Sequence, residues 1–149
     1  MDLAALIVAI VAILVSLFVA IIQYNKEIKL NRINLESVYI NEIYKEYLIT
    51  GLPNARKHLH ITPDGQLLYI DKLVNELNSM RQSSLYYLYN DKEFYNRLKN
   101  NCQLMEDFLV DMSSKEILGE DQVEFYNKIQ SQMKDIYKVV NEKFMGKKF

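Results

Sequence analysis

Two groups of cationic and aromatic side chains are the residues of this sequence best suited to bind another molecule. The first group lies in one short stretch: Arg56, Lys57, His58 and His60. Concentrated positive charge suits anionic lipid head groups, an acidic partner or a phosphate-bearing signal, and it is equally typical of a solvated loop. The turn sequence Pro63-Asp64-Gly65 follows, so we place the group in an irregular stretch, residues 54–66.

The second group surrounds the end of a predicted helix: Arg81, Tyr86, Tyr87 and Tyr89. A guanidinium among aromatic rings can clamp phosphates and stack bases. The alternative is that tyrosines at helical spacing fill the edge of a core. We select Arg81 and Tyr86, together with the first group, as candidate ligand- or partner-binding residues.

Motifs for catalysis or metal binding are missing from the sequence. Its four glycines form no phosphate-binding loop and no nucleophile elbow. His58 and His60 would need an extended backbone and a third ligand to hold a metal. Glu106-Asp107 and Glu120-Asp121 fit solvated faces or helix starts, and Cys102 falls on an apolar stripe typical of a core. We therefore predict no enzymatic activity, no catalytic residue, no metal and no cofactor.

Charge and cysteine content narrow the functional classes further. The chain has 149 residues and a net charge of -1. A protein that binds an extended nucleic acid normally carries a basic excess, so we exclude that class while leaving a local anionic ligand open. The single cysteine cannot form an internal disulfide, which fits a reducing compartment.

The elements that must position these residues begin with a membrane anchor. The twenty residues from Leu3 to Ile22 carry no charge, and Ser16 is their only polar side chain. At ~1.5 Å per residue such a helix covers the ~30 Å hydrocarbon layer of a bilayer. A cleaved signal peptide is the alternative, but the segment lacks a basic start and a small-residue cleavage site. We predict residues 1–23 as a transmembrane anchor and residues 24–149 as a cytoplasmic helical domain.

Flanking charge predicts the orientation of this anchor. Only Met1 and Asp2 precede it, whereas Lys26, Lys29 and Arg32 follow it closely. Positive charge stays on the cytoplasmic side, so we expect a single-pass protein of the cell inner membrane with its C-terminal domain in the cytoplasm.

Small residues form one narrow face of the predicted span: Ala5, Ala9, Ala12, Ser16 and Ala20. At ~100° per residue these positions share one side of a helix, which lets helix backbones approach closely. We predict a homo-oligomer through this face. Two alternatives stay open: alanine is common in membrane helices, and the same face could line a narrow pore with Ser16 as its polar ring.

The remainder of the chain shows helical periodicity and predicts an all-α fold, in which the transmembrane helix continues into an antiparallel helical bundle. A helix should run on from Gln23 and end at Gly51-Leu52-Pro53. A second helix is predicted over residues 67–89, and a third opens with Asn90 as cap and Glu93 reaching back. The expected buried positions of the third and fourth helices are Phe94, Leu98, Cys102, Met105, Phe108 and Met112, then Tyr126, Ile129, Met133, Ile136, Val140 and Phe144.

Two further local predictions concern the connections. His58-Leu59-His60-Ile61 alternates like a short extended piece, but we find no second strand and expect no sheet. Ser113-Ser114-Lys115-Glu116 repeats the capping pattern near a break, with Gly119 close behind.

Three functional classes agree with this organisation. In the first class, the protein is an oligomeric membrane effector, with a channel as one form, that depolarises the membrane when a cytosolic regulatory partner or a signal releases its cytoplasmic domain. Otherwise it is a membrane tether that recruits a cytosolic protein, or an enzyme whose site the sequence does not display.

The layout of the whole chain resembles that of small bacterial membrane effectors. One short uncharged span, a continuous juxtamembrane helix and a compact helical domain are similar to the membrane component of Hailong-type anti-phage defence systems. The resemblance implies an oligomeric, channel-like effector held in check and released on infection. It rests on layout and transfers no functional residue to this sequence.

Overall fold

The computed structural model describes the backbone of residues 3–145. It describes side-chain surroundings over the same range except at residues 3–9, 32, 33, 35, 36, 39, 40 and 145. The fold is mostly helical, and the chain divides into two units, Met1–Tyr39 and Ile40–Phe149. The predicted boundary at residue 23 lies inside a helix, because it marks an expected membrane edge and not a change of fold.

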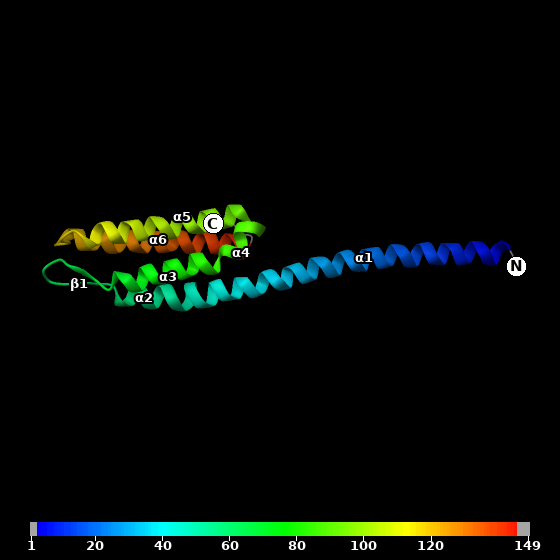
Figure 1. Cartoon of the computed structure of the whole chain (residues 1–149), viewed down its shortest axis with the longest axis horizontal. Helices are drawn as coiled ribbons and strands as arrows, with labels where there is room; N and C mark the ends of the chain where they lie inside the picture. Colours follow the sequence, from blue (N-terminus) through cyan, green and yellow to red (C-terminus); the bar gives the residue numbers. More distant parts are fainter. Residues whose placement is uncertain (1–2, 146–149) are drawn as a thin grey trace. The chain divides into compact units, whose positions relative to one another are not determined.

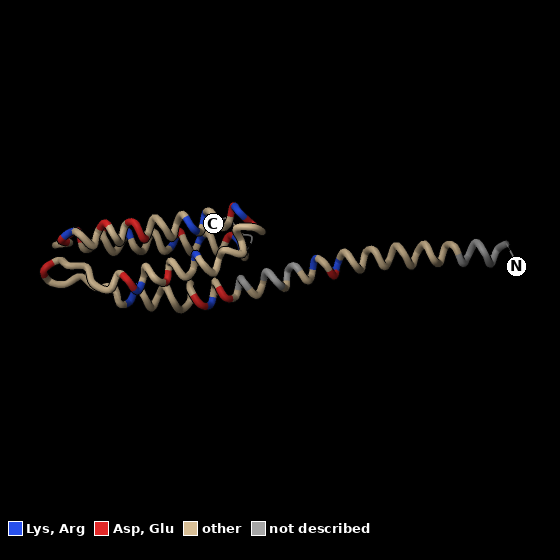
Figure 2. The backbone as a smooth tube through the Cα atoms, in the orientation of Figure 1, with Lys and Arg blue, Asp and Glu red and all other residues tan. Residues whose placement is uncertain are grey.

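The first unit is built from α1, a single helix over Leu3–Glu42 (Figure 1). This confirms that one long apolar helix runs past Gln23 without a break. Within it, Ile10–Asn31 is long and apolar enough to cross a membrane. Figure 2 shows this part of α1 without charged residues until well along the helix. The described side chains of this segment are all exposed, Phe18 for example to 66 %.

The second unit begins with the last residues of α1 and continues with the π-helix η1, Ile43–Gly51, which is followed directly by α2, Leu52–His58. The predicted helix end at Gly51-Leu52-Pro53 is therefore wrong. Gly51 keeps right-handed helical angles, φ -64° and ψ -61°. Pro53 lies in the first turn of α2, a position that proline often occupies because its fixed φ suits a helix.

A small antiparallel hairpin follows, with β1 over His60–Ile61 and β2 over Leu67–Leu68. His60 pairs with Leu68 and Ile61 with Leu67, so the expectation of no sheet is wrong. Two-residue strands are too short to show a periodicity, and the apolar pair of β2 also fits the start of the predicted helix over residues 67–89. At the turn, Gly65 adopts a left-handed φ of 85°, and its carbonyl accepts a 2.9 Å hydrogen bond from the Ile117 N–H.

The predicted second helix is two helices, α3 over Ile70–Ser83 and α4 over Leu85–Asn90. It begins later than expected because Tyr69 has a left-handed φ of 61°. It breaks at Ser84, a buried residue whose hydroxyl donates to the Arg81 carbonyl at 2.8 Å. A serine that bonds its own backbone in this way competes with the regular helix.

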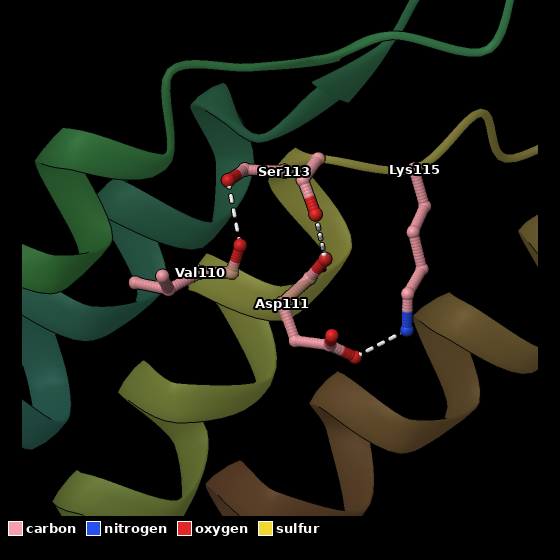
Figure 3. Close-up of polar contacts among 5 residues, drawn as sticks. Val110, Asp111, Ser113 and Lys115 are labelled. Atoms are coloured by element: carbon pink, nitrogen blue, oxygen red, sulfur yellow. Dashed lines mark hydrogen bonds and ion pairs between the residues drawn. The ribbon is translucent and has the colours of Figure 1, made fainter.

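The third and fourth predicted helices are confirmed as α5, Lys92–Ser113, and α6, Glu120–Met145. The cap of α5 is Asp91 and not Asn90: the Asp91 carboxylate accepts a 3.0 Å bond from the Phe94 N–H. Asn90 instead closes α4, with its amide donating to the Tyr86 carbonyl. The serines expected to begin a helix end α5, because the Ser113 hydroxyl donates to the Val110 carbonyl at 2.7 Å (Figure 3).

These helices pack around one apolar core, in which α5 lies against both α3 and α6. Most of the predicted stripe positions of α5 and α6 are buried or half-buried. The fully buried side chains come from every helix of the unit and include Leu48, Leu52, Leu73, Leu77, Met80, Tyr87, Leu98, Met105, Leu109, Phe125, Ile129 and Ile136. The core therefore fixes the position of each helix face that carries a polar contact.

The hairpin turn gives a stability prediction. A Cβ on Gly65 would lie 2.9 Å from the Ile117 nitrogen, whereas a Cβ on Gly119, at φ 57°, would have no atom within 4 Å. We expect Gly65→Ala to lower the free energy of unfolding by about 2 kcal/mol or more, from left-handed strain plus the clash. Gly119→Ala carries the strain alone and should cost about 1 kcal/mol.

Denaturant unfolding of the full chain in neutral detergent, followed by circular dichroism, measures both changes. Equal losses in the two variants would contradict the close packing of the turn against Ile117.

Candidate functional site

The first predicted cluster does not converge on one point. Arg56, Lys57 and His58 lie in the last turn of α2, so the expected irregular stretch is helical there. The Arg56 guanidinium lies 4.7 Å from the centre of the Tyr126 ring on α6. Lys57, His58 and His60 are exposed, and the His58 Nδ1 is 2.7 Å from the Asn54 carbonyl oxygen. Arg56 thus acts as a cation–π contact between helices, and its neighbours form a basic surface.

Arg81 is engaged in a polar network between α3 and α5. Its Nη2 donates to the Glu106 carboxylate and to the Asn78 side-chain oxygen. The side chains of Arg81 and Glu106 are only 19 % and 22 % exposed, so this ion pair is largely removed from water. Such a pair fixes the guanidinium in one orientation, which a free surface arginine lacks.

The aromatic neighbours of Arg81 differ from those expected. Tyr86 packs edge-on against Tyr87, with ring centres 5.3 Å apart. A hollow of about 200 Å³ lies beside Arg81, and Tyr95 and Lys99 from α5 line it while Tyr86 does not. Sequence analysis missed both residues, although their i, i+4 spacing on a helix puts them on one face. The remaining lining residues are Asn78, Gln82 and Leu85.

The π-helix η1 is held by side chains from α3 and α6. The Tyr47 hydroxyl lies 2.8 Å from the Ser83 hydroxyl on α3. The Tyr137 hydroxyl on α6 donates to the Leu48 carbonyl, and burial raises the pKa of this phenol, with a further rise from Tyr44. The Tyr44 ring meets the Phe144 ring edge-on at 6.3 Å. π-Helical segments are rare and concentrate at functional sites, so these contacts mark a candidate coupling element.

The network around Arg81 and one of the contacts that hold η1, Tyr47–Ser83, both lie at the end of α3. Arg81 and Gln82 line the hollow, and the next residue, Ser83, contacts Tyr47 of η1. The break at Ser84 follows at once. One helical turn therefore carries both the polar hollow and a contact to the segment that continues α1.

Cys102 is fully buried on α5 in the core, as predicted. Burial raises the pKa of its thiol to about 12, and of the two nearby charges Arg81 lowers the pKa while Glu106 raises it. A thiol that stays protonated at physiological pH is a poor nucleophile. Cys102 is therefore a packing residue beneath the Arg81–Glu106 pair.

A second set of ion pairs joins α6 to the start of α5. The Lys143 Nζ lies 2.6 Å from the Asp91 carboxylate, and the Arg97 Nη2 lies 2.5 Å from that of Glu142. Burial alone would raise the pKa of Asp91. The hydrogen bonds from Lys143 and the Phe94 N–H, with the charge of Lys143, outweigh it and hold this pKa below its usual value. These pairs fix the C-terminal part of α6, which also carries the Tyr137 and Phe144 contacts.

In the first unit, the small-residue face forms a shallow groove along α1. Ala12, Ser16 and Ala20 line it together with Ile13 and Leu17, around a volume of about 480 Å³. The Ser16 hydroxyl donates to the Ala12 carbonyl at 2.8 Å, which satisfies its proton within the helix. The side chains of Ala5 and Ala9 lie outside the described residues.

Metal chemistry finds no support in the described part of the chain, where no group of three His, Cys, Asp or Glu residues could hold an ion. Comparisons of the chain with protein-family models, curated proteins and solved structures find no match.

The buried thiol gives a chemical prediction. At pH 8 we expect a thiol reagent to label Cys102 of the folded full chain on the order of a hundredfold more slowly than that of the unfolded chain, because the thiolate is scarce and inaccessible. The rate should rise only toward the raised pKa of about 12.

Labelling is measured by mass spectrometry, and Cys102→Ser, which leaves no cysteine, gives the background. Comparable rates in the folded and unfolded chain would show an exposed, reactive thiol and overturn the assignment to the core.

Proposed function

We propose that the protein is an oligomeric membrane effector that depolarises the membrane when its helical domain is released by a partner or signal. The observation that carries this proposal is the exposed apolar segment Ile10–Asn31 of α1. A soluble helix with this much uncovered apolar surface is unfavourable, whereas a lipid-embedded one is stable.

Localisation is proposed from the residues that follow the apolar segment. Lys26, Lys29 and Arg32 come after the uncharged stretch that ends at Ile22, and their positive charge favours the cytoplasmic side. We therefore place the protein in the inner membrane with a single pass and its second unit in the cytoplasm. In that unit we propose an antiparallel bundle, which is supported by the Arg97–Glu142 and Phe108–Phe125 contacts between opposite ends of α5 and α6.

Oligomerisation is proposed through the groove of Ala12, Ser16 and Ala20. Membrane helices associate by close packing because lipid gives no hydrophobic drive between them, and small residues permit that packing. We propose that copies meet at this groove and that the released state forms a leak along it. No catalytic residue, metal or cofactor takes part in this proposal.

Control by the second unit is proposed to act through η1. The clamps at Ser83 and Tyr137 hold the segment that continues α1, so a partner that shifts α3 or α6 changes the support of η1. The regulator is proposed to be a cytosolic protein or a small acidic signal. The likeness to Hailong-type anti-phage effectors rests on layout alone, and we keep it as part of the proposal.

A membrane tether that recruits a cytosolic protein is the second candidate. It is favoured by the large apolar side chains that the second unit exposes, among them Tyr89 at 87 %, Val123 at 63 % and Leu104 at 60 %. Exposed aromatic and aliphatic residues are typical of protein–protein contacts.

In bacteria that produce the full chain, we expect a voltage-sensitive dye to report loss of membrane potential after induction or phage infection. Ala12→Leu fills the groove with a larger side chain. It should raise the dissociation constant of the oligomer in detergent at least about tenfold and prevent the loss of potential.

Val11→Leu is the matched control, because residue 11 lies on the face of α1 away from the groove and the substitution keeps the span apolar. It should leave oligomers and depolarisation unchanged. An intact potential under both induction and infection would contradict the effector proposal. If deletion of residues 1–22 then releases a bound protein into the soluble fraction, the tether is the correct function.

A further inference from the structure

The hollow between the end of α3 and the first half of α5 has the chemistry of an anion site. We propose that it binds the phosphate group of a small acidic ligand, held by Arg81, Lys99 and Tyr95. The role of this binding as a trigger rests on the proposed function, whereas the binding itself does not.

Arg81 supplies preorganised donors. A guanidinium has five N–H groups, and the hydrogen bonds of Arg81 to Glu106 and Asn78 both use Nη2. Within the described residues, neither bond uses the three N–H groups on Nη1 and Nε. These three donors are therefore left for a ligand. Because Glu106 and Asn78 already fix the side chain, a ligand would lose little entropy in ordering it.

The charge of the lining favours an anion. Lys99 adds a second cation, and Asn78, Gln82 and Tyr95 add neutral groups that can donate. If the negative charge of Glu106 is set against the positive charge of Arg81, Lys99 still leaves a net positive charge beside the hollow. Three other hollows described in the second unit each include a carboxylate, such as Glu142, Asp121 or Asp135, whereas this lining contains none.

The size of the hollow limits the ligand. Its volume of about 200 Å³ is smaller than the ~300–1,000 Å³ of pockets that enclose a whole small molecule. It can therefore take one phosphate group while the rest of the ligand lies outside, along Leu85, which is 48 % exposed. A planar guanidinium, an ammonium and a phenol match the several oxygens of a phosphate.

The position of the hollow explains how binding could reach η1. Arg81 and Gln82 belong to the turn of α3 that ends in Ser83, whose hydroxyl contacts that of Tyr47. A phosphate that draws this turn toward Lys99 on α5 would act on the Tyr47 contact. A shared contact of this kind is a physical basis for coupling between a ligand and the η1 segment.

The test is isothermal titration of inorganic phosphate into the full chain in neutral detergent at constant ionic strength. We expect saturable binding that Lys99→Ala weakens at least about tenfold, because a charged hydrogen-bond partner is lost from an exposed position where folding is unaffected. Tyr95→Phe keeps the ring and should weaken binding severalfold. Arg81→Lys keeps a positive charge for the ion pair with Glu106 but removes the planar guanidinium with its paired N–H donors. It should therefore also weaken binding.

Lys134→Ala is the matched control, since Lys134 is an exposed lysine of α6 that does not line the hollow. It should change the affinity by less than twofold. Absence of saturable binding, or equal weakening by Lys134→Ala and Lys99→Ala, would overturn the proposal.

The source of the phosphate is distinguished in nanodiscs of phosphatidylcholine with and without phosphatidic acid. Competition by phosphatidic acid, lost in Lys99→Ala, identifies a lipid head group as the occupant, and its absence identifies a soluble ligand. Because the titration does not depend on membrane potential, phosphate binding without depolarisation would sink the proposed function alone. Depolarisation without phosphate binding would sink this inference alone.

Discussion

The exposed apolar surface of α1 is the constraint on which the remaining interpretation depends. Its described side chains from Ile10 to Ile22 are all exposed, and a helix satisfies its own backbone groups except at its ends. Such a helix is stable where lipid or another apolar helix covers it. The groove at Ala12, Ser16 and Ala20 is the part of that surface where another helix can approach most closely.

The second unit holds a π-helical segment, η1, in place. η1 buries Ile43 and Leu48, and its polar contacts come from two directions, Ser83 on α3 and Tyr137 on α6. Because η1 follows α1 without a break, these contacts give the domain a hold on the segment next to the apolar helix. Arg81 and its polar network lie on the same turn of α3 as Ser83. The same turn therefore carries the proposed ligand-binding residue and a contact that holds η1.

The sequence predicts the long helices, whose apolar residues repeat at helical spacing over many turns. It does not predict the short strands or the helix break, which depend on one or two residues each. α5 and α6 followed from apolar spacing, and Cys102 was placed correctly in the core. The hairpin was missed because its strands have two residues each. Pro53 predicts the end of a helix, although a proline in the first turn also suits one, and no propensity rule signals that Ser84 would break a helix. At the site, the sequence predicts Arg81, but its partner Glu106 and the lining residues Tyr95 and Lys99 come close to it only through the packing of α3 on α5.

We propose that α1 crosses a bilayer and that the second unit lies in the cytoplasm. Alkaline carbonate extraction of membranes, combined with protease treatment of intact spheroplasts, tests it most directly. We expect the full chain to stay in the membrane pellet and its second unit to be digested only after the spheroplasts are lysed. Release of the chain by carbonate, or digestion of the second unit in intact spheroplasts, would contradict it.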